Sequence, residues 1–183
     1  MIEGERFLKI SSLRSLGALV ALTGFASLSL AQSALERHVW QEARSFSPVS
    51  RTAVAITGEI TLSGNDRFAE PGSTMRMTFG NGAVVDLVSE GASWRPWEIG
   101  SPDKQTAEVF RLSEDPGPLV NGNSLCGAGE AGEALYAVFF TDRFMDGPLT
   151  LILAVFQSPD PPFNINSDGI CGTYSFDAEA ADR

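Results

Sequence analysis

Hydrophobic and polar positions alternate with a period of two through much of the chain. The alternating stretches are residues 54–62, 74–79, 83–88 and 106–112. This period is typical of strands that bury one face. Two of the stretches flank Gly80-Asn81-Gly82, which predicts a tight β-hairpin turn. Much of the chain should therefore be an antiparallel sheet.

Two later stretches are hydrophobic at almost every position. They are residues 134–141 (ALYAVFFT) and 149–156 (LTLILAVF). Their length of eight residues and their Tyr, Val, Phe and Ile content favour strand over helix. Continuous apolar runs fit central strands that are buried on both faces. With a last strand over residues 171–176, we expect a mainly β fold. Its architecture would be an antiparallel barrel or sandwich of about seven to eight strands.

The segment before the sheet has a helical pattern instead. Apolar residues recur on one face of residues 33–46, and Pro48 follows. Ser33 and Glu36 have the spacing of a capping box, in which two side chains bond the first backbone N–H groups of a helix. We therefore expect one short N-terminal helix here.

The first 31 residues have the three parts of a secretory signal peptide. Basic residues occur in the first 14 positions, an uncharged apolar run follows from Leu16 to Leu30, and small residues precede Gln32. The run is shorter than the roughly 20 residues of a membrane span. We expect cleavage after Ala31, a periplasmic or secreted product and no stable membrane anchor.

These patterns give a plan of the whole chain. Residues 1–31 are the expected signal peptide, 32–50 a helical segment, 51–177 a single β domain and 178–183 a disordered tail. Residues 94–97 (WRPW) interrupt the alternation and are expected to be irregular strand or loop.

The chain is acidic, and its net charge changes when the expected signal peptide is removed. The full chain has 13 basic and 23 acidic residues and a net charge of −10. Without residues 1–31, which hold three basic and two acidic residues, 152 residues carry −11. This charge argues against a nucleic-acid partner and favours a soluble monomer. The acidic residues are scattered, so the charge indicates either solubility alone or an acidic face for a basic protein partner.

The two cysteines, Cys126 and Cys171, are expected to form one disulfide bond in an exported chain. Each stands between an apolar residue and a glycine, which suggests a close backbone approach. A free catalytic thiol would need a nearby base. The chain has one histidine, His38, in the segment expected to be helical, where it should be a surface residue.

Enzyme chemistry has little support in the sequence. The chain has no G-x-S-x-G, P-loop or H-E-x-x-H motif. We therefore expect a non-enzymatic protein without a cofactor. A hydrolase that uses two carboxylates stays open as a further alternative, because acidic residues are abundant.

Two short segments are candidate binding sites. Trp94, Arg95 and Trp97 could form an aromatic surface for a ligand or partner, although tryptophan more often contributes to a core. Residues 164–169 copy the first half of a calcium loop, with Asn164, Asn166 and Asp168 as candidate ligands. This calcium candidate is weak, because the segment has a single carboxylate and its residue types also form ordinary turns.

Two functional hypotheses follow. In the first, loops 114–132 and 157–169, tied together by the disulfide, bind a basic protein, for example as an inhibitor of a basic enzyme. In the second, a barrel cavity carries a small apolar ligand. The side chains expected to line that cavity are Met75, Met77, Phe79, Phe139 and Phe156.

Four short motifs resemble a group of small exported bacterial proteins of unknown function. The motifs are LxGN at 62–65, MTFGNGA at 77–83, NSLCG at 123–127 and ICGTYSF at 170–176. The resemblance implies export, a disulfide and a compact β domain, and it brings no activity and no site residues.

Overall fold

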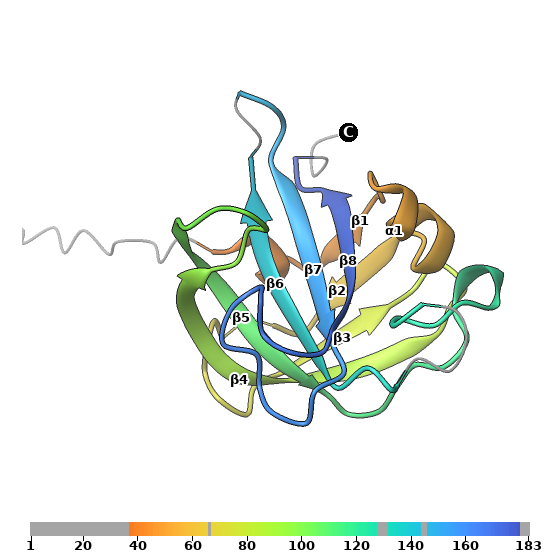
Figure 1. The fold of residues 1–183 in the computed structure, drawn as a ribbon. Helices are drawn as coiled ribbons and strands as arrows, with labels where there is room; N and C mark the ends of the chain where they lie inside the picture. Colours follow the sequence, from red (N-terminus) through yellow and green to blue (C-terminus); the bar gives the residue numbers. More distant parts are fainter. Residues whose placement is uncertain (1–36, 66, 128–131, 144–145, 180–183) are drawn as a thin grey trace, which may run out of the picture. The chain divides into compact units, whose positions relative to one another are not determined.

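The computed structural model describes residues 37–65, 67–127, 132–143 and 146–179, which all belong to one compact unit. They form a single antiparallel sheet of eight strands, in which each strand pairs with the next in the chain (Figure 1). The strands are β1 (Arg44–Phe46), β2 (Ile60–Ser63), β3 (Thr74–Thr78), β4 (Val84–Pro96), β5 (Lys104–Leu112), β6 (Tyr136–Asp142), β7 (Thr150–Phe156) and β8 (Ile170–Asp177). The expectation of a mainly β, antiparallel fold is confirmed.

The N-terminal part of the described chain differs from the prediction. Residues 37–46 contain one turn of 3-10 helix, η1 (Val39–Gln41), and then β1, where an α-helix was expected. The short helix α1 (Arg51–Ile56) instead occupies part of a predicted strand. Ser50 caps α1 by accepting a hydrogen bond from the Ala53 backbone N–H (3.1 Å). The proposed capping residues Ser33 and Glu36, like the expected signal peptide, lie outside the described residues.

The two edges of the sheet are joined by the segment that follows β1. The Asp177 N–H donates to the Ser47 carbonyl (2.9 Å), and the Val49 N–H donates to the Ser175 carbonyl (2.8 Å). Between these bonds, Pro48 forms an isolated bridge with Phe176 of β8. β1 and β8 themselves form no ladder with each other, since β1 pairs with β2 and β8 pairs with β7.

One face of the curved sheet surrounds the main core. All eight strands contribute to this inner cluster, from Phe46 of β1 to Phe176 of β8. A second, outer cluster covers the opposite face of β5, β6 and β7, where Val138 and Phe156 are buried. The prediction that 134–141 and 149–156 are buried on both faces is therefore confirmed. Of the expected cavity residues, Met75, Met77, Phe79 and Phe139 pack in the inner cluster, whereas Phe156 belongs to the outer one.

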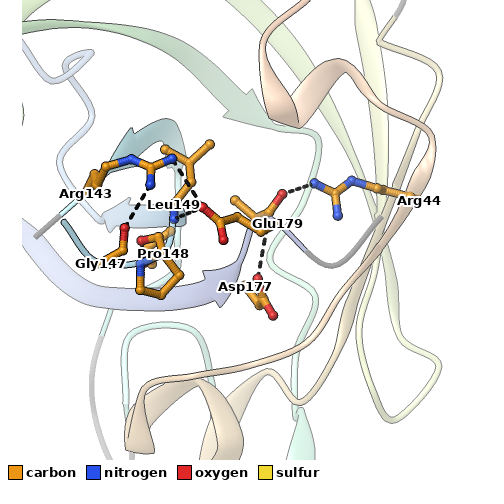
Figure 2. A network of polar contacts seen from close by, with 9 residues as sticks. Arg44, Arg143, Gly147, Pro148, Leu149, Asp177 and Glu179 are labelled. Atoms are coloured by element: carbon orange, nitrogen blue, oxygen red, sulfur yellow. Dashed lines mark hydrogen bonds and ion pairs between the residues drawn. The ribbon is translucent and has the colours of Figure 1, made fainter. Parts of the chain in front are cut away.

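The start of the expected tail is held in place. Figure 2 shows Glu179 accepting a hydrogen bond from the Leu149 N–H (2.9 Å) and pairing with the Arg143 guanidinium (3.2 Å). Ala178 donates its N–H to the Leu149 carbonyl (3.0 Å). Residues 178 and 179 are thus fixed to the β6–β7 connection, and residues 180–183 of the expected tail lie outside the described residues.

The structure contains the expected disulfide between Cys126 and Cys171. Gly172 explains why a glycine follows the second cysteine, since a Cβ there would lie 2.7 Å from the Leu125 carbonyl oxygen. The buried hydroxyl of Tyr174 donates a hydrogen bond to that same carbonyl. The loop that carries Cys126 is therefore attached to β8 by a covalent bond and by a buried hydrogen bond.

Burial raises the pKa of the Tyr174 hydroxyl to about 12. The protonated form is favoured in the folded protein, so this stabilisation is complete below the ordinary tyrosine pKa near 10. It should decline as pH rises from about 10 to 12.

The change Tyr174→Phe should remove this part of the alkaline destabilisation. It should also lower the free energy of unfolding at neutral pH by about 1–2 kcal/mol, because the Leu125 carbonyl loses its donor. Urea unfolding at several pH values tests both effects. An unchanged alkaline slope in the variant would contradict the assignment.

Candidate functional site

The end of β4 places the predicted aromatic segment on two sides of the sheet. Neighbours across an antiparallel pair share a face. Trp94 pairs with Thr106 and therefore lies on the same side as Glu108, which faces the inner core. Arg95 pairs with Gln105 and lies on the opposite, outer side. The structure thus separates Trp94 from Arg95, and the three-residue surface expected from the sequence is divided.

The two tryptophans also differ in exposure. The Trp94 side chain is 59% exposed, whereas Trp97 is fully buried in the outer cluster. The ring of Trp97 lies next to that of Phe140 of β6, with 6.3 Å between ring centroids. Trp97 therefore has the core role that tryptophan commonly has, and Trp94 does not.

The loop between β7 and β8 packs against the end of β4. Ile165 donates its backbone N–H to the Pro96 carbonyl (3.1 Å). The guanidinium of Arg95 lies over the Phe163 ring, 4.4 Å from its centroid, as in a cation–π contact. Two features that the sequence analysis treated separately, the aromatic segment and loop 157–169, therefore form one surface. We call this surface, made of Arg95, Trp97, Ile99, Phe163 and Ile165, the Trp97 face.

A surface pocket of about 270 Å³ opens on the Trp97 face, over the outer side of the last three strands. Its apolar lining is Trp97, Ile99, Phe140, Ile152 and Ile165. Its polar lining is Glu98, Asp142, Thr173 and Ser175. The pocket combines an apolar wall with two carboxylates and two hydroxyls, and none of the described residues that line it is basic. An apolar pocket with a few converging polar groups is the usual form of a binding site.

A second hollow of about 390 Å³ continues along the sheet from this pocket. The two share Asp142, Ile152 and Ser175, and the second extends to Val49 and Pro148. Together they form a groove across the outer face of β6, β7 and β8.

The other expected recognition loop lies elsewhere. The part of loop 114–132 that contains η2 (Val120–Gly122) packs beside α1, on the right in Figure 1. Asn121 and Asn123 both donate side-chain hydrogen bonds to the Ala55 carbonyl (3.1 and 3.2 Å). The disulfide connects this loop to the start of β8, but none of the described residues of the loop lines the groove.

The weak calcium candidate has the hydrogen bonds of an ordinary turn. The Asn164 side-chain oxygen accepts from the Asn166 N–H (2.8 Å), and the Ser167 hydroxyl accepts from the Asn164 N–H (3.0 Å). Among the described residues, no three His, Cys, Asp or Glu side chains are grouped so that they could hold a metal ion. The Asn164 and Ser167 side chains thus shape the loop that carries Ile165.

A buried polar centre lies on the inner side of β5, and the sequence analysis did not identify it. The Glu108 carboxylate is fully buried. It accepts hydrogen bonds from Trp40 Nε1 (2.9 Å), Asn65 Nδ2 (3.3 Å), the Ala69 N–H (3.1 Å) and the Ser89 hydroxyl (2.7 Å). These donors come from η1, the β2–β3 connection and β4, so Glu108 fastens three segments to β5.

His38 lies beside this centre and is half-buried, whereas the sequence suggested a surface position on a helix. Its ring stacks on Trp40, with 4.7 Å between centroids, and lies 4.2 Å from the Phe68 ring. These ring contacts involve Trp40, which is one of the donors to Glu108. Among the described residues, the hydrogen bonds of Glu108 are all with neutral donors.

Comparison of the chain with models of protein families, with curated proteins and with solved structures finds no match. In the described part of the chain, no helix has the length and apolar character needed to cross a membrane.

Proposed function

We propose that this chain is an exported, non-enzymatic binding domain that recognises a basic protein through the Trp97 face. One observation carries the proposal: an apolar pocket lined by two carboxylates opens beside two large, highly exposed apolar side chains. Ile99 is 68% exposed and Phe163 is 60% exposed. Aromatic residues and arginine are enriched at protein interfaces, and here Phe163 lies beside Arg95.

The charge of the protein supports a basic partner. The chain has a net charge of −10, and the pocket and its continuation are lined by acidic and neutral residues. A basic protein would be drawn to this surface by the long-range field and then held by the apolar contacts. An inhibitor of a basic envelope or extracellular enzyme would have these properties.

The substitution Phe163→Ser tests the proposal against a matched control. The purified domain is used to capture partners from a cell-envelope extract at low salt, and the dissociation constant of the captured basic protein is then measured. We expect Phe163→Ser and Ile99→Ser each to weaken binding about tenfold or more, because each removes an exposed apolar contact.

Trp94→Ser is the control, since Trp94 is equally exposed (59%) but lies on the other side of β4. It should leave the dissociation constant within about twofold of the unmodified protein. Recovery of no basic protein at low salt would overturn the proposed function. An equal loss of binding in the Trp94→Ser variant would overturn the assignment of the face.

A further inference from the structure

The two charged side chains that line the pocket are both acidic, so they favour a positively charged ligand. Glu98 and Asp142 line it, and in the described part of the chain neither carboxylate forms an ion pair with an Arg or Lys side chain. A bound cation would therefore supply a charge partner that the protein itself does not provide. Because the pocket is partly shielded by its apolar wall, such a pair is screened less by salt than one on a flat surface.

The apolar groups of the pocket fit a long side chain. Ile99, Ile152 and Ile165 offer an aliphatic wall, and the Phe140 and Trp97 rings lie close to each other within the lining. Lysine and arginine bury their methylene stems on apolar surface while the charged end stays near polar groups. Their cations also bind favourably against aromatic rings.

The indole of Trp97 supplies an independent observation. Its Nε1 is buried and has no hydrogen-bond acceptor among the described residues. A buried donor without an acceptor is unfavourable, so the folded chain keeps an unsatisfied polar group at a residue that lines the pocket. Because the Trp97 side chain has no exposed surface, this N–H lies behind the pocket lining and reports on the pocket without contacting a ligand.

We infer that the pocket is a subsite for one lysine or arginine residue of the partner protein, an inference that rests on the proposed function. The charged end lies near Glu98 and Asp142, and the stem packs on the isoleucine wall. The adjoining hollow, which shares Asp142, Ile152 and Ser175, receives the residues that follow in the segment.

Small probes test the subsite without the partner. The probes are N-acetyl-arginine amide and N-acetyl-lysine amide, compared with N-acetyl-norleucine amide, which keeps the stem and carbonyls but has no charge. The chain has three tryptophans, so three indole N–H signals report in a nitrogen–proton correlation spectrum. Trp40 serves as an internal reference, because its N–H is bonded to Glu108 on the inner side of the sheet.

We expect the two cationic probes to shift the Trp97 signal in a saturable manner and to leave the Trp40 signal unmoved. The norleucine probe should bind about tenfold more weakly, because it lacks the charge. Raising the salt concentration should weaken the cationic probes alone. Equal binding of norleucine, or a Trp97 signal that no probe moves, would overturn the subsite.

Isosteric variants test whether Glu98 and Asp142 supply the negative charge that binds the cationic probes. Glu98→Gln and Asp142→Asn should each weaken the cationic probes about threefold, and the double variant about tenfold. The control is Glu59→Gln, which removes the same charge at an exposed position that does not line the groove. It should leave probe binding unchanged. The inference fails if the pocket variants behave like Glu59→Gln.

The two proposals fail in different ways. If a basic protein is captured and depends on Phe163 but the cationic probes do not bind, the subsite is wrong and the proposed function stands. If the probes bind through Asp142 and Glu98 but no basic protein is captured, the pocket is a cation subsite and the proposed function is wrong.

Discussion

Replacing Glu108 by glutamine is expected to lower the free energy of unfolding by about 3 kcal/mol. The carboxylate is fully buried and accepts four hydrogen bonds, two at each oxygen. Glutamine has the same shape, but its amide nitrogen is only a hydrogen-bond donor. This nitrogen replaces one of the two carboxylate oxygens, so the two groups that donate to that oxygen face another donor. Each buried donor left without an acceptor costs about 1–3 kcal/mol.

The position of the new amide decides the size of the effect. The Asn65 side-chain oxygen is buried and has no partner among the described residues. If the introduced amide nitrogen faces Asn65, rotation of the Asn65 amide would offer that oxygen as an acceptor and recover one bond. The Trp40 indole N–H, bonded to the same carboxylate oxygen, would still lose its acceptor. Glu108→Ala should cost more than Glu108→Gln, because it adds a cavity to the lost bonds.

Urea unfolding measures both variants, with Glu59→Gln as a control for the removal of one negative charge. The control should change the free energy of unfolding by less than about 0.5 kcal/mol, since Glu59 is exposed. The indole signal of Trp40 gives a local readout and should move in Glu108→Gln. A loss below about 1 kcal/mol, with the Trp40 signal unmoved, would contradict the assigned role of this centre.

Removal of the disulfide is expected to have a similar or larger effect. Cys126 and Cys171 are separated by 45 positions in the sequence. In the chain-entropy account, the bond restricts the unfolded chain and contributes on the order of 4 kcal/mol for a loop of this length. The double variant Cys126→Ala/Cys171→Ala should lose about that amount, and reduction of the unmodified protein should reproduce it.

The loss should also show locally. The Tyr174 hydroxyl donates to the carbonyl of Leu125, the residue before Cys126. A freed loop would expose this bond to water, so the raised pKa of Tyr174 should fall toward the ordinary tyrosine value. Ultraviolet titration of the double variant measures this change. A stability within about 1 kcal/mol of the unmodified protein would show that the packing of the loop against α1 and β8 suffices without the bond.

Most strands could be predicted because burial of one face or of both faces leaves a distinct hydrophobic pattern in the sequence. The alternation of Met75 and Met77 with polar residues predicts β3, and the continuous apolar runs predict β6 and β7, which are covered on both faces. The helix predicted for residues 33–46 is wrong where that segment is described, and the strand predicted for residues 54–62 is confirmed only from Ile60 onward, in β2. The alanine, threonine and valine residues of Arg51–Ile56 are compatible with an alternating strand pattern and also with a short helix. The N-cap at Ser50 favours the helix.

The face of each residue at the candidate site could not be predicted, because a β-bulge changes the count. Between Ser89 and Gly91 the register of β4 against β5 shifts by one residue. Counting by twos from Leu87 would place Arg95 on the inner side and Trp94 on the outer side. The bulge, at which Gly91 has a φ of +116°, reverses this assignment. A glycine at this position suggests the end of a strand, whereas β4 continues through it.

The buried carboxylate was missed for a related reason. Glu108 is two and four positions before Phe110 and Leu112, which both face the inner core. Residues two apart in a strand share a face, so this spacing was the one indication in the sequence that Glu108 faces inward. A glutamate in a strand is usually exposed. Its burial depends on donors from Trp40, Asn65 and Ser89, which are 68, 43 and 19 positions away in the sequence. No local pattern contains that information.

The bridge between Pro48 and Phe176 has a consequence for the behaviour of the protein at high concentration. An open sheet presents unpaired backbone groups at both edges, and these can recruit the edge of a second molecule. Here β1 is only three residues long, the next residues donate to and accept from β8, and Pro48 has no N–H to offer. The backbone groups at the β8 edge are therefore paired in part with the segment that follows β1 in the same chain. The sheet should consequently resist strand-to-strand aggregation through backbone geometry, in addition to the repulsion between its acidic surfaces.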